Sequence, residues 1–524
     1  MQLIKKIFNT LLVAIGIALM VVLFGFAIMM IFHVSIFGYT FVKQSDSKTL
    51  LVSNIDISNL KKIDVSTSNI DVIVQYASDS AGTVTTGAVT TVVDMQGIMK
   101  SEKTKYSYVN PTDENDASYK PVVDSDGVLK IVTNEPEGLY FVNKSYVRIV
   151  LPRGTNLQDL VVSTGSNAVD IGNEQQEPKT FVVDNLTVTA NKGLLKGGLT
   201  LSSKLIVKKQ LNLVTNFGKI EVNCQVLGDV NIKSSAGSIF FNSDIPGNVE
   251  ISGQNPYVCF GSYNNENISK KVDIKGNLYI HNCTDGGNVK VAGNVDKVVT
   301  IQKSPYVEFW ANDINGGLSC TDGVNGIKVF GNINGIDSTI NCEDGYLYLN
   351  NVYTKLKVVS QKNGVKVANA HNDVIITNNN SDTFVNFADD ATDKTLVVEN
   401  AHGNITATNI MGTASLTATL GKVNASFKKV VGENKIVAKY GADVKVQDGL
   451  TFELTTKGTP ACKLDVELGS VNYNNWLQAT DIEGYKVRTD IVNQDESSEV
   501  ADKLFVQVTD NGTISAKFVV AKQD

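Results

Sequence analysis

Short alternations of apolar and polar residues run through most of the chain after residue 50, and Gly, Asn or Asp usually stands between them. A period of two bounded by turn residues predicts short β-strands. One pair of apolar residues, two positions apart, recurs at steps of 18 to 21 residues, with a single step of 31. The first members of these pairs are Ile220, Ile239, Val258, Val289, Val307, Ile327, Leu347, Val365, Val385, Ile405, Val423 and Val444.

A second series of apolar pairs falls between members of the first, so each repeat of about 19–20 residues carries at least two strands. Repeats stacked at the sheet spacing of about 4.8 Å align their inward pairs in continuous columns. The sequence therefore predicts an all-β protein with an elongated β-solenoid over residues 151–475. The step of 31 predicts an insertion near Tyr263–Lys271. The second series is Val230/Ile232, Val249/Ile251, Leu278/Ile280, Val299/Ile301, Leu318/Cys320, Leu356/Val358, Val374/Ile376, Leu396/Val398 and Ala414/Leu416.

A β-sandwich is the alternative fold, because it also consists of many short strands separated by turns. Its core does not require the same two inward positions in twelve successive repeats. The ends of a solenoid expose unpaired strand edges, which need caps. The predicted caps are an initial β region over residues 50–150, with an insertion at Ala77–Ser118, and terminal strands over residues 476–524.

The amino-terminal segment is strongly apolar, with no Asp, Glu, Lys or Arg between Lys6 and Lys43. A helix of about 20 apolar residues crosses the bilayer core, so residues 7–41 are predicted to form one transmembrane helix that anchors the chain. A cleaved signal peptide is the alternative, but its apolar region is only about 7–15 residues long and ends at small residues. Lys5 and Lys6 predict a cytoplasmic tail, residues 1–6, with the bulk of the chain outside the cell membrane.

The charge balance argues against a nucleic-acid-binding protein. The chain has 47 Lys+Arg against 54 Asp+Glu, a net charge of -7, and three arginines, Arg148, Arg153 and Arg488. A protein that follows a phosphate backbone needs a basic stripe, which scattered lysines do not form. We therefore predict no nucleic-acid partner.

Three copies of a Cys-x-Asp-Gly motif contain Asp285, Asp322 and Asp344. One interpretation is a column of carboxylates that binds Ca²⁺ through oxygen ligands. The other is a chain corner, in which Gly adopts a positive φ and Asp bonds its own backbone. The absence of the Gly-rich calcium-binding nonapeptide favours the corner, so no metal site is predicted.

The cysteines offer a similar choice between chemistry and packing. Cys320 and Cys342 fall in inward positions of consecutive repeats, where stacked Cα atoms about 4.8 Å apart suit a disulfide. Each stands where other repeats have Ile or Val, which favours a free, buried thiol. The six cysteines are Cys224, Cys259, Cys283, Cys320, Cys342 and Cys462.

No nucleophile motif, phosphate loop or zinc motif occurs, and we predict no catalytic residue and no cofactor. Tyr257, Tyr306 and Trp310 lie in two Pro-Tyr-Val segments and are predicted to face outward. Such rings offer a surface on which a sugar stacks. Packing against a loop is the alternative, and the favoured one, because single exposed apolar residues are common.

Three stretches resemble one bacterial family. Ile55–Val74 resembles its first strands, Tyr146–Gly165 its strand, Leu-Pro turn and first solenoid repeat, and Leu504–Ile514 its terminal strands. The family is the bacterial putative-adhesin domain family, a domain of unknown function. The resemblance implies a β-solenoid core and an extracytoplasmic location, and it supplies no catalytic residues. Some members occur beside envelope-stress regulators, which adds a sensing role.

These features predict a non-enzymatic, membrane-anchored, extracytoplasmic protein that is adhesin-like or a scaffold of the cell envelope. Envelope-stress sensing, or assembly with another membrane protein, is the alternative. A polysaccharide-cleaving β-solenoid enzyme is a third hypothesis, which rests on fold analogy alone. The predicted partners are the membrane, through the amino-terminal helix, and an envelope glycan or another envelope protein.

The predicted orientation has a direct test in protease digestion of intact cells. Because the charges before residues 7–41 stay inside, external protease should degrade residues 45–524 and leave cytoplasmic control proteins whole. Immunoblotting with antibodies to the carboxyl-terminal half measures the loss. Protection of residues 45–524 on intact cells would show that the orientation is wrong.

Overall fold

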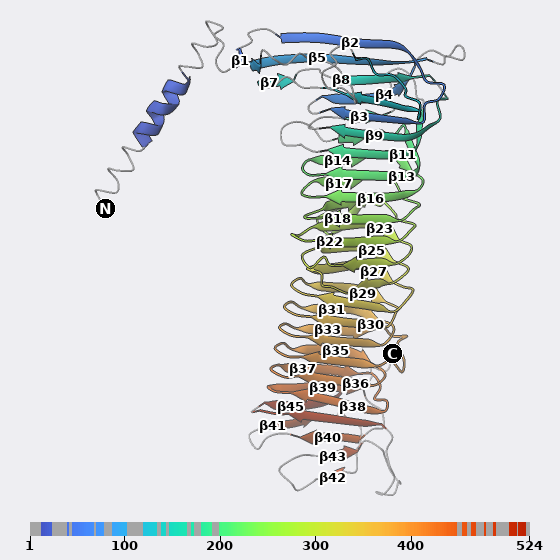
Figure 1. The fold of residues 1–524 in the computed structure, drawn as a ribbon. Coiled ribbons are helices and arrows are strands. Elements are labelled where there is room, and N and C mark those ends of the chain that lie inside the picture. The colour runs from blue at the N-terminus through green and yellow to red at the C-terminus, as the bar shows by residue number, and fades with distance from the viewer. Residues whose placement is uncertain are drawn as a thin grey trace. The chain divides into compact units, whose positions relative to one another are not determined.

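The computed structural model is nearly all-β, and the chain divides into two compact units, Met1–Gln225 and Val226–Asp524. Figure 1 shows the strands of each unit and labels many of them as they are named below. The structure describes residues 12–23, 39–40, 45–67, 70–77, 86–101, 119–133, 138–142, 146–152, 154–164, 169–171, 180–190, 199–447, 453–457, 463–467, 476–477, 486–488, 502–510 and 512–519.

Residues 12–23 form a helix with exposed side chains. Among the residues that the structure describes, no helix has both the length and the apolar character needed to cross a membrane. The predicted cytoplasmic tail, residues 1–6, and most of the predicted anchor, residues 7–41, lie outside the described residues. The described helix therefore does not support the predicted transmembrane span.

A parallel sheet in the first unit has the strand order β6-β3-β9-β11-β13. Alternate residues are buried, and in β3 Ile63 and Val65 are fully buried between half-exposed neighbours. This alternation is the period of two that the sequence shows. The strands are β3 (Lys62–Thr67), β6 (Val128–Val132), β9 (Leu157–Thr164), β11 (Phe181–Ala190) and β13 (Leu205–Thr215).

The other strands of the first unit combine both pairing directions. β4 pairs in parallel with β8 and β10, whereas β5 pairs in the antiparallel direction with β1, β2, β7 and β8. β12 pairs in parallel with β14. These strands are β1 (Tyr39–Thr40), β2 (Ser45–Asp56), β4 (Asp71–Tyr76), β5 (Thr86–Ser101), β7 (Gly138–Val142), β8 (Tyr146–Leu151), β10 (Val169–Ile171), β12 (Leu199–Leu201) and β14 (Lys219–Val222); β15 (Gln225–Val226) spans the boundary between the units.

The second unit consists mainly of two long sheets, called sheet 1 and sheet 2, in which strands of successive repeats pair in parallel (Figure 1). This arrangement is typical of a β-solenoid. Sheet 1 contains β16 (Asp229–Ser234), β18 (Val249–Gly253), β22 (Leu278–Cys283), β24 (Val299–Gln302), β26 (Leu318–Cys320), β28 (Ser338–Cys342), β30 (Leu356–Ser360), β32 (Val374–Asn378), β34 (Leu396–Asn400), β36 (Ala414–Ala418), β38 (Glu433–Ala438), β44 (Lys503–Val508), β40 (Glu453–Lys457), β43 (Lys486–Arg488) and β42 (Trp476–Leu477), in that spatial order. At the end of this sheet, β43 pairs in the antiparallel direction with β40 and β42.

Sheet 2 takes its strands from the other half of each repeat. Its inward side chains lie opposite one another in register, and the rings of Phe241 and Phe260 stack with centroids 4.7 Å apart. In spatial order the strands are β17 (Ser238–Phe241), β19 (Tyr257–Phe260), β23 (Asn288–Val295), β25 (Glu308–Ile314), β27 (Gly326–Ile333), β29 (Leu347–Val352), β31 (Val365–Ala370), β33 (Thr383–Phe387), β35 (Ile405–Ile410), β37 (Lys422–Phe427), β39 (Gly441–Gln447), β45 (Thr513–Val519) and β41 (Lys463–Glu467).

The structure corrects the predicted alignment of the repeats at three strands. Val289 lies opposite Phe309 and not Val307, Val365 lies opposite Thr383 and not Val385, and Val423 lies opposite Ala442 and not Val444. Each error is a shift of two residues, which keeps the same side chains on the inward face. At β25, Val307, Phe309 and Ala311 are all buried, so the apolar pattern alone does not distinguish the two registers.

The predicted second series does not include β28 and β38 of sheet 1, because a polar residue fills an inward position in each of these strands. Ser338 lies opposite Leu356, and its Oγ accepts a hydrogen bond from the backbone N–H of Leu318 at 3.2 Å. Asn434 is also buried, and its Oδ1 accepts from the N–H of Ala414 at 2.7 Å. Both side chains satisfy the first amide of the preceding strand, which offsets the cost of burying a polar group.

Five neighbouring strands of sheet 2, β27 to β35, carry a ladder of asparagines at the bend where each strand ends. The Nδ2 of Asn351 donates to the Oδ1 of Asn332 at 2.8 Å, and Asn369 donates in the same way to Asn351 at 2.9 Å. Asn386 and Asn409 continue the series. Amide ladders of this kind join identical positions of stacked strands, and here they hold the bends of consecutive repeats together.

The long repeat step contains a small antiparallel hairpin. β20 (Ser262–Asn264) pairs with β21 (Asn267–Lys270), while the flanking strands β19 and β23 pair directly with each other. The additional residues therefore leave the register of sheet 2 intact and project from it, as insertions in repeat proteins do.

The last two strands of the chain do not lie at the end of the stack. β44 pairs in parallel with both β38 and β40, and β45 pairs with both β39 and β41. The repeat formed by β40 and β41 is therefore separated from β38 and β39 by strands that come later in the sequence. Residues 476–524 are predicted to form a terminal cap; of this segment, β44 and β45 are internal to the sheets, whereas β43 and β42 lie at the end of sheet 1.

The columns make a prediction about stability that uses two phenylalanines of one strand. Phe387 is 1% exposed and points inward from β33, whereas Phe384 points outward. Phe387→Ala should lower the free energy of unfolding by about 3–5 kcal/mol, because it leaves a cavity in the core. Phe384→Ala should change it by about 1 kcal/mol or less.

Urea denaturation of the two variants, followed by circular dichroism, measures the difference. Equal losses in both variants would contradict the assignment of inward and outward faces on β33.

Candidate binding surfaces

The outward face of sheet 2 carries a column of alternating lysines and aromatic rings. Its members occupy equivalent outward positions on six neighbouring strands and lie directly opposite one another in the parallel register. We call this set the ring–lysine column. It consists of Lys290 (β23), Trp310 (β25), Lys328 (β27), Tyr348 (β29), Lys366 (β31) and Phe384 (β33).

Trp310 lies between two lysines of the column. The Nζ of Lys290 is 3.8 Å from the centre of its ring, and the Nζ of Lys328 is 4.6 Å away. Its indole N–H donates to the Oε1 of Glu308 at 2.6 Å. With the rings of Tyr263 and Phe330 also against it, Trp310 is 8% exposed, although it points outward. The ring is thus a platform for cations, an arrangement favoured by its negative face.

The β20–β21 hairpin covers this part of the column. Tyr263 meets Trp310 edge to face, with ring centroids 5.6 Å apart, and its hydroxyl donates to the backbone oxygen of Val291 at 2.6 Å. Glu266 forms an ion pair with Lys328 at 2.7 Å. Burial raises the pKa of the Tyr263 phenol above its usual range, so the hydroxyl stays protonated as a donor.

The open part of the column begins at Tyr348 on β29, the strand that follows those contacted by the hairpin, and continues to Phe384 on β33. The Nζ of Lys366 lies 5.4 Å from the centre of the Tyr348 ring and 5.8 Å from that of Phe384. Lys366 makes no ion pair among the residues that the structure describes. Beside these three residues, Tyr346 is 43% exposed and points outward from the turn before β29.

The structure places the three predicted aromatics in different surroundings. Trp310 is enclosed by Tyr263 of the hairpin and by two lysines of the column. Tyr257 and Tyr306 are 37% and 52% exposed. Tyr257 lies in a neighbouring outward position opposite Asn288, and Tyr306 precedes β25. Among the residues that the structure describes, no ring contact joins any two of the three.

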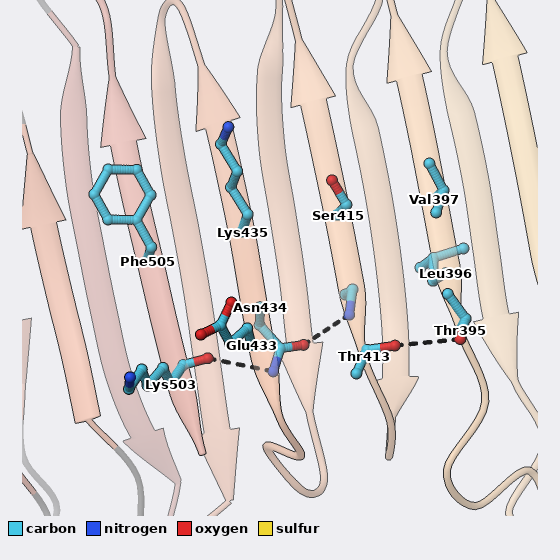
Figure 2. Close-up of a pocket in the computed structure, with 11 residues that line it drawn as sticks. Thr395, Leu396, Val397, Thr413, Ser415, Glu433, Asn434, Lys435, Lys503 and Phe505 are labelled. Carbon is cyan, nitrogen blue, oxygen red and sulfur yellow. Dashed lines mark hydrogen bonds between the residues drawn. The ribbon is translucent and has the colours of Figure 1, made fainter. Parts of the chain in front are cut away.

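A second surface feature is a hollow of about 430 Å³ on the outward face of sheet 1. Figure 2 shows Phe505, Lys435, Ser415 and Val397 in one row across neighbouring strands. Ser415 is the smallest of the four, so the sheet is hollowed there. One carboxyl group, Glu433, lines the hollow, whereas glycoside hydrolysis commonly uses two.

The Cys-x-Asp-Gly motifs occupy corners of the chain. The thiol of Cys342 donates to the backbone oxygen of Gly345 at 3.2 Å, and Ser360 bonds Asn363 in the equivalent way at 3.0 Å. Asp344 forms an ion pair with Lys362 at 2.5 Å. Among the described residues, no group of His, Cys, Asp and Glu side chains is arranged to hold a metal ion.

Cys320 and Cys342 are not stacked in the way that the alignment predicted. Cys320 lies opposite Ile340, and Cys342 lies opposite Ser360, so the two cysteines are two residues out of register. Both are free and buried. Burial raises the pKa of the Cys320 thiol to about 12 and that of Cys342 to about 11. Such thiols are weak nucleophiles near neutral pH.

Comparisons with known proteins add little to this geometry. No family model and no curated protein matches the sequence. Among solved structures, a putative cell adhesion protein from Clostridium sporogenes matches with a TM-score of 0.14 and 8% identity, over 91% of this chain and 100% of that chain. A TM-score this low carries no argument about fold or function. The resemblance to the putative-adhesin domain family stays a prediction.

Burial of the thiols predicts a slow reaction with thiol reagents and a free energy of unfolding that depends on pH. In a Cys462→Ser variant, the five cysteines Cys224, Cys259, Cys283, Cys320 and Cys342 should resist a colorimetric thiol reagent at about pH 8 and react after unfolding, since an unfolded thiol has a pKa of about 8.5. Because the folded-state pKa is raised, the unfolded state loses its protons first. The free energy of unfolding should therefore fall as pH rises above about 8.5.

The reaction is followed by absorbance, and stability by urea denaturation over the same pH range. Rapid reaction of a native thiol at neutral pH, or constant stability above the unfolded pKa, would contradict this account.

Proposed function

We propose that this chain is a non-enzymatic, extracytoplasmic binding protein of the cell envelope, adhesin-like or a scaffold. The observation that carries the proposal is the in-register repetition of outward side chains on sheet 2 of the second unit, of which the ring–lysine column is the most distinctive example. A polymer with a repeating structure meets the same chemistry at each step along such a face. Weak contacts then add, because one bound segment raises the effective concentration of the next.

The rigidity of the sheets supports binding by many weak contacts. Inward columns of Val, Ile, Leu and Phe are fully buried, and each such side chain contributes about 1.5–3 kcal/mol relative to exposure. The outward side chains are therefore held at fixed spacing before a ligand arrives. A preorganised surface loses less conformational entropy on binding.

Attachment to a membrane is the part of the proposal that comes from the sequence. Residues 7–41 lack charged side chains, and a segment of this kind partitions into a bilayer. The two lysines before it favour an extracytoplasmic second unit. Protease digestion of intact cells, described above, tests this part separately from binding.

The alternative function is envelope-stress sensing or assembly with another membrane protein. The hollow on sheet 1 supplies a specific surface for it, because the small Ser415 stands between the larger Lys435 and Val397, and Phe505 lies on the far side of Lys435. A protein side chain that enters such a depression would be desolvated, as at the centres of protein interfaces. A polysaccharide-cleaving enzyme remains the third hypothesis.

Co-sedimentation with envelope polymers separates these functions. Full-length protein in detergent is incubated with isolated envelope polysaccharide and with peptidoglycan, and bound protein and released reducing ends are measured in the same tubes. We expect binding without release, because the proposed role is adhesion. Release of sugar ends would overturn the non-enzymatic assignment, and absence of both would favour a protein partner.

A further inference from the structure

The charge of the ring–lysine column runs against that of the whole chain. The protein has a net charge of -7, yet every second member of the column, three of the six, is a lysine. The next residues in the same position are Thr406, Asn424 and Asp443, so the pattern ends at Phe384. Before Lys290 the same position holds Cys259 and Phe240, so the regular alternation of lysines and rings is a local feature of this face.

The geometry points to a binding site for a linear acidic polysaccharide whose sugars carry carboxylates. We propose that its open part is formed by Tyr348, Lys366 and Phe384, with Tyr346 beside them. This inference rests on the proposed function and names the ligand class. The two rings would stack on the apolar faces of sugars, and Lys366 between them would bind a carboxylate.

The spacing suits an extended glycan. Neighbouring strands lie about 4.8 Å apart, so equivalent rings or lysines recur at about 9.6 Å. This distance is comparable with the length of a disaccharide in an extended polysaccharide. A ring at every second strand would meet every second sugar, and a lysine between two rings would meet the carboxylate of the sugar between them.

The hairpin already makes a carboxylate contact and a ring contact with the part of the column that it covers, at Trp310 and Lys328. Glu266 places a carboxylate on Lys328, and Tyr263 places a ring against Trp310. The covered part thus shows that the column accepts a carboxylate and a ring side by side. The corresponding contacts of Lys366, Tyr348 and Phe384 are not supplied by the hairpin, which makes them the surface for an external ligand.

The environment of Lys366 favours a carboxylate ligand. It lies between two rings at 5.4 and 5.8 Å, and no acidic side chain among the described residues forms an ion pair with it. A lysine partly desolvated by aromatic neighbours binds an anion more strongly than one in open water. Three lysines in one column are too few to follow a nucleic-acid backbone.

Tyr346 extends the platform because its neighbour is a glycine. A Cβ at Gly364 would lie 3.2 Å from the Cε2 of the Tyr346 ring, closer than most side chains approach. Gly364 therefore lets this ring rest against the strand. The phenol is half-exposed and next to Tyr348, so the open part of the column presents two tyrosine rings side by side.

Calorimetric titration of the full-length protein in detergent tests the inference. The probes are polygalacturonate, the same polymer with its carboxyl groups methyl-esterified, and inorganic polyphosphate. We expect polygalacturonate to bind at least about tenfold more tightly than either of the others, because both the carboxylate and the sugar face are recognised.

Two variants and a matched control locate the site. Lys366→Gln should weaken polygalacturonate binding about tenfold, through the loss of a charged hydrogen bond. Phe384→Ala should weaken it about fivefold, through the loss of stacking. Lys357→Gln makes the same change in net charge on the exposed face of sheet 1 and should leave binding within about twofold. Thermal unfolding of each variant shows that the fold is kept.

Three outcomes would overturn the inference: equal binding of the esterified polymer, equal binding of polyphosphate, or equal losses in Lys366→Gln and Lys357→Gln. If envelope polysaccharide sediments the protein but polygalacturonate does not bind, this inference fails and the proposed function stands. If neither polymer binds, both fail.

Discussion

Parallel pairing between equivalent positions of consecutive repeats is the constraint on which the second unit depends. Because each strand lies opposite the strand one repeat away, a residue type that recurs in the sequence becomes a column in space. Inward columns form the core, buried Ser338 and Asn434 satisfy strand amides, and asparagine ladders join the bends. The same pairing produces the ring–lysine column outside. One strand register therefore determines both the inward columns of the core and the outward columns of the surface.

The repeat could be predicted from the sequence because the core demands apolar residues at fixed intervals. The exact register could not, since a strand with three inward apolar positions satisfies that demand in two ways. Val307, Phe309 and Ala311 show the difficulty, because all three are buried. Polar residues in inward positions cause the opposite error. Thr383 is buried, and its hydroxyl accepts a hydrogen bond from Asn378. Because Thr383 is polar, a pattern of apolar residues does not identify it as an inward position.

The ambiguity between two strand registers also hid the candidate site. Trp310 could be singled out as a rare aromatic residue, but its column could not be seen. The alignment predicted from the sequence is wrong by two residues at β25 and β33. In that alignment Glu308 and Asn386 occupy the outward position in place of Trp310 and Phe384, and the alternation of lysines and rings disappears. The hairpin's contacts with Lys328 and Trp310 depend on how an insertion folds back. No periodic pattern contains that information.

The position of β44 and β45 between earlier strands has a consequence for how the chain acquires its structure. A stack whose order in space follows the order of synthesis can grow one repeat at a time behind the ribosome or the translocation channel. Here β40 and β41 are made before the strands that connect them to β38 and β39. The last repeats must therefore wait, with open edges, until the final segment of the polypeptide emerges.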